Sequence, residues 1–403
     1  MPNAFTIEQA STVLNDVYEQ ITGKPISAIT SPADFVSVGQ TLLQTGRDPV
    51  LNAISQMWSR SIFSYRDYKA PMNTLEMDLD RYGNAIRKLS PVAREMADDE
   101  SFIYPVAYDA INYPLNPYGD GVSVDMWEIA KQKVQQMNFY GTAVYQQKYT
   151  IFKDQFDNAF SSADEFGRFN AMMLTERNNE KEQYKEAVGR GIQLNFIGAL
   201  IDEAATDRVV HLLTEYNAVT GLTLTAQTVM QNTNYVPFIR WAWARIKTLI
   251  RLMGTRSFRF QTVVNNEPIL RFTRPENMRV ALLASAYDQI ETMAMSDTYH
   301  DDYLKGVTFE SVDFWQSIDS PDEISVTPVY TDNTGSVATA SAVSQTGVFG
   351  ILHDRDALGY SMVNSWSAVT PLNIDGGYWN ESYHARIKTI QDNTEKAVVL
   401  LLD

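Results

Sequence analysis

The sequence predicts an α+β protein built from several sub-domains. Its 403 residues exceed the usual size of a single hydrophobic core. Helix-compatible patterns dominate residues 163–254, and strand-like patterns dominate from residue 257 onward. No strand–helix–strand unit repeats along the chain, so a barrel, a doubly wound sheet or a solenoid is not expected.

Composition restricts the chemistry that is available. The chain has no cysteine, which excludes disulfides, cysteine-ligated metals and thiol catalysis. The N-terminus has no signal-peptide pattern and the chain has no apolar run of membrane-spanning length, so we expect a soluble protein made in a cytoplasm, with no membrane partner. The net charge of −16 argues against a duplex-DNA binder, because neutralising phosphates requires a basic face.

Residues 1–61 contain three segments with helix start and stop signals. Thr6 can cap a first helix that ends before Gly23. Pro32 opens a second helix that ends near Gly46, and the Asp48-Pro49 pair opens a third. We expect either a small helical subdomain or a helical arm that contacts other molecules.

Residues 62–150 are extended and aromatic. Partial alternation over residues 76–88 predicts a strand, and residues 143–151 predict another. Tyrosines and prolines are interleaved over residues 104–118, which indicates an irregular loop, and an apolar face over residues 124–137 predicts a helix. We therefore expect an extended loop with flanking strands.

Residues 151–203 contain the strongest local signal. Ser162 and Glu165 form a capping-box pattern, and no proline follows until well past Leu200. Between Glu176 and Glu186 the pattern is polar on every face, which is typical of a helix that bridges through solvent or lies across a shared surface. We expect one long helix.

Residues 204–345 change from helices to strands. Three helices are expected at residues 208–216, 225–231 and 236–253. Strands are expected at residues 258–264, 269–273, 279–283, 307–314 and 324–330, followed by a loop or hairpin at residues 331–347.

No catalytic, cofactor or metal site is assigned. The four histidines show no metal-ligand spacing, and we interpret the acidic stretch at residues 297–302 as a solvated turn. Nucleophile elbows and phosphate loops are absent from the sequence. Paired carboxylates in an aromatic cleft would suit a glycan-active enzyme, but the aromatic residues are scattered in a way that favours core and interface packing.

Charge is separated along the chain. Residues 240–279 carry nine basic residues against two acids, and residues 286–325 carry ten acids against one lysine. These segments could pair within one molecule or across the interfaces of a ring of identical subunits, where they would set the register. A single-strand nucleic-acid face is a weaker interpretation, because of the global negative charge. The inter-subunit contact candidates are Arg240, Arg245, Lys247, Arg251, Arg256, Asp297, Asp301, Asp302, Asp319 and Asp322.

Residues 346–403 carry the most informative motif. An apolar run from Val348 leads into a charged turn, Asp354-Arg-Asp-Ala-Leu-Gly359, and two further strand patterns follow at residues 383–390 and 397–402. This order, together with the strand at residues 83–88, resembles tailed-phage major capsid proteins. The resemblance is strongest to those of small short-tailed podophages of Gram-positive bacteria.

The resemblance implies a capsid fold with an N-terminal arm (1–61), an extended loop (62–150), a peripheral domain around the long helix (151–203), an axial domain with returning peripheral strands (204–345) and C-terminal strands (346–403). It implies a structural protein without catalytic residues that assembles in the host cytoplasm, as pentamers and hexamers, into the icosahedral shell of the virion. The implied partners are a scaffolding protein, a portal, a decoration or head-fibre protein, and double-stranded DNA enclosed without sequence-specific binding. The alternatives are a virion-associated or secreted glycan-active enzyme, or another virion component such as a portal or tail protein.

Overall fold

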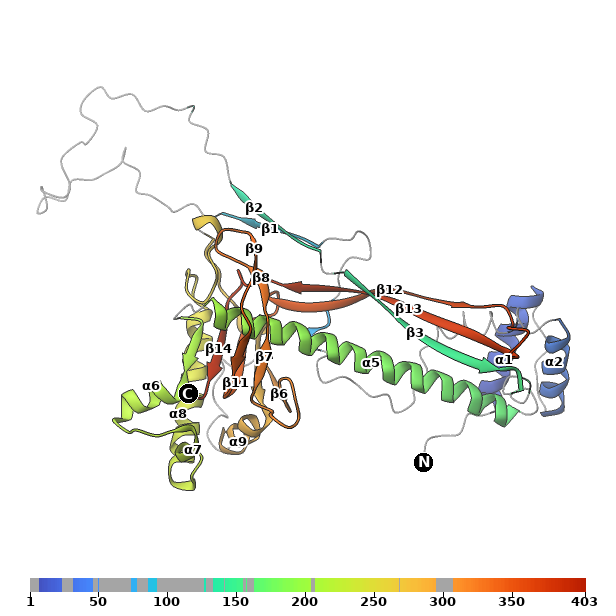
Figure 1. Ribbon diagram of the computed structural model, residues 1–403, viewed down its shortest axis with the longest axis horizontal. Coiled ribbons are helices and arrows are strands. Elements are labelled where there is room, and N and C mark those ends of the chain that lie inside the picture. Colours follow the sequence, from blue (N-terminus) through green and yellow to red (C-terminus); the bar gives the residue numbers. More distant parts are fainter. Residues whose placement is uncertain are drawn as a thin grey trace, which may run out of the picture.

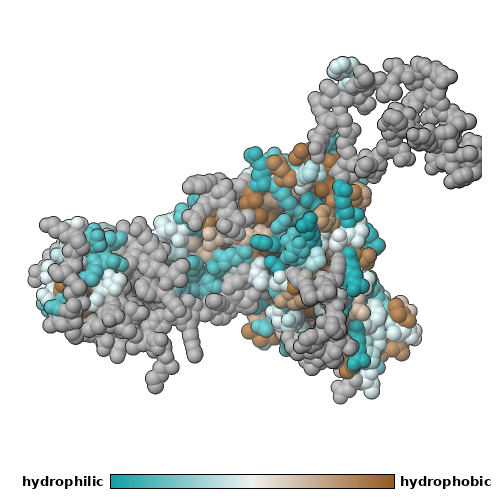
Figure 2. All heavy atoms as spheres, turned by 180° about the vertical axis from the view of Figure 1, so that it is seen from behind, coloured by the Kyte–Doolittle hydropathy of each residue, from teal (hydrophilic) through white to brown (hydrophobic). Residues whose placement is uncertain are grey.

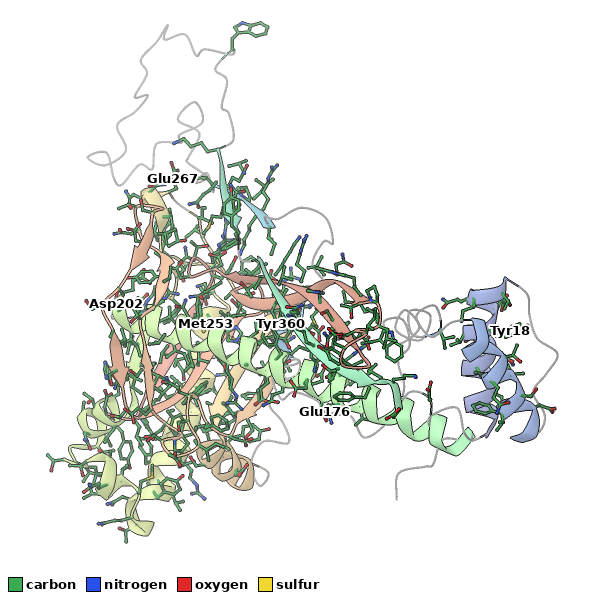
Figure 3. All side chains as sticks on the ribbon, turned by 45° about the vertical axis from the view of Figure 1, so that its right-hand side comes forward. Tyr18, Glu176, Asp202, Met253, Glu267 and Tyr360 are labelled. Atoms are coloured by element: carbon green, nitrogen blue, oxygen red, sulfur yellow. The ribbon has the colours of Figure 1, made fainter. Side chains whose placement is uncertain are left out.

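One long helix organises the molecule. The computed structural model describes residues 7–23, 32–45, 50, 74–77, 86–92, 127, 133–140, 142–154, 157, 163–203, 207–267, 269–294 and 307–403. Helix α5 (Ala163–Asp202) is 40 residues long and runs along the body (Figure 1). Tyr18 lies near one end of the molecule and Asp202 near the other (Figure 3). The predicted long helix is confirmed.

A three-stranded antiparallel sheet lies along α5 (Figure 1). Its order is β12-β13-β3, with bounds Leu358–Val369, Tyr378–Gln391 and Thr142–Phe152. Side chains of β13 alternate between buried and half-buried along most of the strand, so one face packs on α5. The strands predicted at residues 143–151 and 383–390 are confirmed.

Two N-terminal helices lie at the far end of α5 (Figure 1). They are α1 (Ile7–Thr22) and α2 (Pro32–Thr45), and both contact α5. Gly23 ends α1 with φ 68°, a conformation that glycine adopts without strain. The first two predicted helices are confirmed, and the third lies outside the described residues apart from Val50.

A five-stranded mixed sheet forms the second structural unit. Its order is β4-β14-β11-β5-β6, and the two outer pairs, β4 with β14 and β5 with β6, are parallel. The bounds are Val209–His211, Ala397–Leu401, Val348–Asp354, Met278–Leu283 and Thr308–Val312. Four helices share a hydrophobic core with this sheet. They are α6 (Leu212–Thr220), α7 (Ala226–Val229), α8 (Asn232–Met253) and α9 (Ala284–Ala294).

Both faces of the five-stranded sheet are buried. Val398 and Leu400 of β14 pack in a core with α6, α8 and α9. Ala397, Val399 and Leu401 face the opposite core, which contains the C-terminal end of α5. A strand covered on both faces reads as a continuous apolar run, which explains the sequence of β14. The predicted strand at residues 397–402 is confirmed.

The surface of the molecule is mixed in character. On the face shown in Figure 2, exposed apolar side chains are scattered among polar ones.

A two-stranded antiparallel hairpin, β1 (Ile86–Pro91) with β2 (Val134–Phe139), projects from the body (Figure 1). The end of the helix predicted at residues 124–137 is therefore wrong. Gln135, Met137 and Phe139 are half-buried and the residues between them are exposed, which is the two-residue period of a strand. Pairing with β1, more than forty residues away in sequence, decides this conformation, and local periodicity did not reveal it.

The segment between α8 and β5 is irregular, so the strands predicted at residues 258–264 and 269–273 are wrong. Among the described residues of this segment, strand-like pairing is limited to an isolated bridge between Ser257 and Arg271. Phe260 has φ 66°, and its N–H donates to the Asp207 carboxylate at 2.8 Å. The Gln261 amide donates to the Ile269 carbonyl at 2.6 Å. Side chains form hydrogen bonds with these backbone groups, so the groups do not need a neighbouring strand as a hydrogen-bond partner.

Two further predictions need correction at their boundaries. Residues 209–211 form β4, paired with β14, and α6 begins only at Leu212. The strand predicted at residues 324–330 is divided around Pro328 into β7 (Ile324–Val326) and β8 (Val329–Thr331). β8 pairs with β9 (Val337–Thr339), and β7 pairs with β10 (Val343–Gln345), so the predicted hairpin is present.

Candidate assembly surfaces and the contacts that support them

The cationic residues of α8 lie in two environments. Arg240 and Arg251 are exposed, as is Arg256, which follows the end of the helix at Met253. Arg245 instead forms a two-point ion pair with Glu215 of α6, at 2.6 and 2.9 Å. The ammonium group of Lys247 lies 5.6 Å from the centre of the Trp243 ring. Arg245 is therefore engaged within the subunit.

The acidic candidates that the structure describes are on the loop between β6 and β7. Asp319 and Asp322 are exposed there, and neither forms an ion pair with any residue in the described part of the chain. Trp315 anchors this loop, because it is buried and its indole N–H donates to the Val348 carbonyl at 2.8 Å. Asp297, Asp301 and Asp302 lie outside the described residues.

Two cations of the polar part of α5, Arg177 and Lys185, are buried, while most of the other polar side chains over residues 176–186 are half-buried or exposed. Of the two interpretations that the sequence allowed, the contacts of Arg177 fit a helix that lies across a shared surface. Arg177 donates to the Glu381 carboxylate of β13, and both side chains are buried. The Arg177 guanidinium lies 5.3 Å from the Tyr383 ring centre and 5.9 Å from that of Tyr149. Burial raises the pKa of Tyr149 to about 12. Ion pairing with the sheet therefore allows a cation of this helix to be buried.

A buried polar turn joins β13 to β14. Asp392 and Glu395 both accept from the ammonium group of Lys88 in β1, each at 2.5 Å. Arg271 pairs with Glu395 at 3.0 Å and also donates to Ser90 of β1 at 2.9 Å. Two cations and two carboxylates thus fasten the base of the projecting hairpin to the body.

Lys396, at the end of the same turn, organises the irregular segment after α8. Its ammonium group donates to the carbonyls of Thr255 and Arg259 at 3.0 and 3.2 Å, and to the Ser257 hydroxyl at 3.0 Å. Burial lowers the pKa of Lys396 to about 8. The sequence did not single out this turn, because its partners come from positions as distant as Lys88; its only signal was a run of polar residues between two apolar strands.

Each of the three histidines that the structure describes contacts a neighbouring group of the same chain. His211 contacts the Asp403 carboxylate at 2.5 Å, and the His384 ring stacks on Trp366 with centroids 5.0 Å apart. His353 is buried in β11 and bonds the Asp354 carbonyl at 2.8 Å through Nδ1. In the part of the chain that the structure describes, no three His, Asp or Glu side chains are grouped closely enough to hold a metal ion. Nor does any helix of that part combine the length and apolar character needed to cross a bilayer.

The buried His353 predicts an acid-sensitive contribution to stability. Burial lowers its pKa to about 4, against about 6.5 in an unfolded chain. Between these values the unfolded chain binds a proton that the folded chain does not, so stability should fall with pH from about 6.5 to 4, by about 3 kcal/mol. Urea unfolding measures the unfolding free energy of the wild type and of His353→Gln at each pH. The difference between the two proteins should shrink as the pH falls, because only the wild type loses this contribution. Parallel pH curves for the two proteins would contradict the assignment.

A long helix crossing one sheet, a second mixed sheet and a projecting hairpin together form the fold of tailed-phage capsid subunits. The capsid structure of Staphylococcus phage Andhra is similar, with a TM-score of 0.51 and 9% identity, covering 85% of this chain and 87% of that chain. A structure from bacteriophage P68, described as its head fibre and inner core protein, gives a TM-score of 0.50 and 8% identity, covering 85% and 87%. No curated protein matches the sequence.

The chain belongs to the family of Phi29-like phage major capsid proteins, which matches residues 11–400. It is a structural protein of the phage virion, and copies of it assemble into the capsid shell. The resemblance drawn from the sequence is confirmed, and the family favours a shell subunit over the enzyme, portal and tail alternatives.

Proposed function

We propose that neighbouring copies in the shell contact each other through Arg240 of α8 and Arg256 just beyond the end of this helix, and through the acidic loop between β6 and β7. The observation that carries this is the exposure of Arg240, Arg256, Asp319 and Asp322, none of which has an ion-pair partner among the described residues. In a chain of net charge −16, exposed cations without an acidic neighbour favour an acidic partner surface. Such pairing sets the register between copies more than it adds affinity.

Charge reversal with rescue tests this contact. Arg240→Glu with Arg256→Glu should reduce assembly by about tenfold or more, because each reversal places like charges across the interface. Adding Asp319→Arg and Asp322→Arg should restore assembly, and circular dichroism should be unchanged throughout. The particle yield by sedimentation is the measurement, and Lys148→Glu on β3 is the control. Normal assembly of the first variant, or no rescue by the second pair, would contradict the contact.

We also propose a division of the fold between the two sheets. The part formed by α5 with β3, β12 and β13 would be the peripheral domain, and the five-stranded sheet with α6 to α9 would be the axial domain at the centres of pentamers and hexamers. The separation of the two sheets along α5 supports this division (Figure 1). The predicted boundary near residue 203 agrees with it, since α5 ends at Asp202.

The partners follow from the same role. We propose an icosahedral shell that encloses double-stranded DNA without reading its sequence and without a catalytic step, with a scaffolding protein, a portal and a head-fibre or decoration protein as further partners. The net charge of −16 supports enclosure over adhesion, since a wall that repels phosphates does not hold the packaged duplex. The similar structure from bacteriophage P68 is described as its head fibre and inner core protein, which supports a head-fibre protein as a partner.

A further inference from the structure

Ile318 lies within the acidic loop between β6 and β7, and this loop is fixed at both ends. The backbone N–H of Trp315 donates across the loop to the Pro321 carbonyl at 3.0 Å. The Gln316 side chain closes the loop a second time, since its amide donates to the Ser325 carbonyl at 3.1 Å and accepts from the Ser325 N–H at 2.6 Å. The Ile318 side chain is nevertheless 76% exposed. The loop therefore holds a large apolar side chain in water on a fixed backbone, which has little conformational freedom left to lose on binding.

Phe258 is a second exposed apolar side chain on a fixed segment, the one that follows α8. Its side chain is 43% exposed, whereas Phe260, two residues later, is buried in the core that contains α8. The ammonium group of Lys396 donates to the carbonyls of Thr255 and Arg259, which lie on either side of Phe258 in the sequence. These bonds fix the backbone on both sides of Phe258, so its ring is held at the surface.

Charges of opposite sign accompany the two apolar side chains. Each of these charged residues is exposed and has no ion-pair partner among the described residues: Asp319 and Asp322 close to Ile318 in the sequence, and Arg256 and Arg259 close to Phe258. One exposed apolar side chain needs no explanation. Two of them, each on a fixed backbone and each next to unpaired charges, have the composition of the two halves of a protein–protein contact, in which an apolar centre is surrounded by a polar rim.

The two surfaces lie on opposite faces of the five-stranded sheet. Phe260 and α8 pack in the core on one face, and Trp315 packs in the core on the other face. Figure 1 shows the same separation, with α8 on one side of β14 and β11 and with β6 on the other side. A contact between the two surfaces therefore joins two copies of the chain. Such a contact between different surfaces continues from copy to copy and closes into a ring where the rotation allows it.

We propose that Ile318 of one copy packs on Phe258 of the next copy, with the aspartates of the loop facing the arginines on either side of Phe258. The inference rests on the proposed function and deepens it, because it places the acidic loop at the C-terminal end of α8 and gives the contact an apolar centre. A second copy is the occupant that the charges favour, since the same chain supplies both the acidic and the cationic surface. The apolar pair contributes affinity by leaving water, and the charges set the register.

A pair of introduced cysteines tests this contact without background, because the chain has no cysteine of its own. Shells of Ile318→Cys with Phe258→Cys are treated with a short bis-maleimide cross-linker and analysed on a denaturing gel. We expect a ladder of covalently joined copies that extends to closed rings, in shells and not in free subunits. Ile374→Cys with Phe258→Cys is the control, since Ile374 is 93% exposed in the turn between β12 and β13, and it should give no ladder. Shells of the first pair without a ladder, or equal ladders from both pairs, would overturn the proposal.

Serine substitutions give an independent result that leaves every charge in place. Ile318→Ser should lower the particle yield by about tenfold or more, whereas Ile374→Ser should assemble as the wild type does. Circular dichroism and the thermal unfolding of the free subunit should be unchanged in both, because both side chains are exposed in the subunit. Equal particle yields from the two variants would overturn the proposal.

The charge reversal at Arg240 and Arg256 tests the proposed function separately. If that variant assembles normally, the proposed charge contact fails. If it does not assemble, but Ile318→Ser and Ile374→Ser give equal yields and the cysteine pair gives no ladder, only the apolar contact of Ile318 with Phe258 fails.

Discussion

Deleting residues 398–403 should give an insoluble or unfolded chain, not a soluble subunit that fails to assemble. Val398 to Leu401 are buried between two cores, and β14 pairs with both β4 and β11. Each buried aliphatic side chain contributes roughly 1.5–3 kcal/mol, so the strand accounts for a large part of the roughly 5–15 kcal/mol by which a domain is stable. The soluble fraction and far-ultraviolet circular dichroism are the measurements.

A pair of single substitutions serves as the control for this deletion. Leu400→Ala, in the core, should cost about 2–5 kcal/mol, whereas Leu402→Ala, which is only partly buried, should cost clearly less. A soluble and cooperatively folding truncated protein would contradict the account and would show that β14 is an exchangeable arm.

Replacing Arg177 by methionine should cost about 3–5 kcal/mol of unfolding free energy. The change leaves the Glu381 carboxylate, which is fully buried, without its cation beneath α5. Removing both charges with Arg177→Met and Glu381→Met should cost much less, because no unpaired buried charge remains. Urea unfolding of the free subunit measures both variants.

The surface pair of α8 and α6 provides the comparison. Arg245→Met breaks the Arg245–Glu215 pair, in which both side chains are partly exposed, and should cost less than about 1 kcal/mol. If Arg177→Met is no more destabilising than Arg245→Met, the α5–sheet layer is not held by its buried charges.

The parts of the fold that the sequence predicted are those with local causes. Gly23 and Pro32 are stop and start signals that act within one turn, and α1 and α2 have the expected limits. The apolar run of β14 reflects burial on both faces. The length of α5 follows from the absence of proline over 40 residues.

The parts that the sequence did not predict have distant causes. β2 is a strand because β1 lies beside it, and the segment after α8 is irregular because Lys396 and Asp207 bond its backbone. A local count of charges cannot tell that Glu215 engages Arg245 within the subunit, or that Glu76 pairs with Lys185 from more than a hundred residues away. Such distinctions depend on contacts between residues far apart in sequence.

Electron cryo-microscopy of the purified protein, assembled alone or with the proposed scaffolding protein, tests the central claim most directly. The account predicts closed shells built from this chain, with Arg240 of α8 and the acidic loop between β6 and β7 both buried against neighbouring copies. Monomers that never assemble, or shells in which both surfaces face solvent, would contradict it.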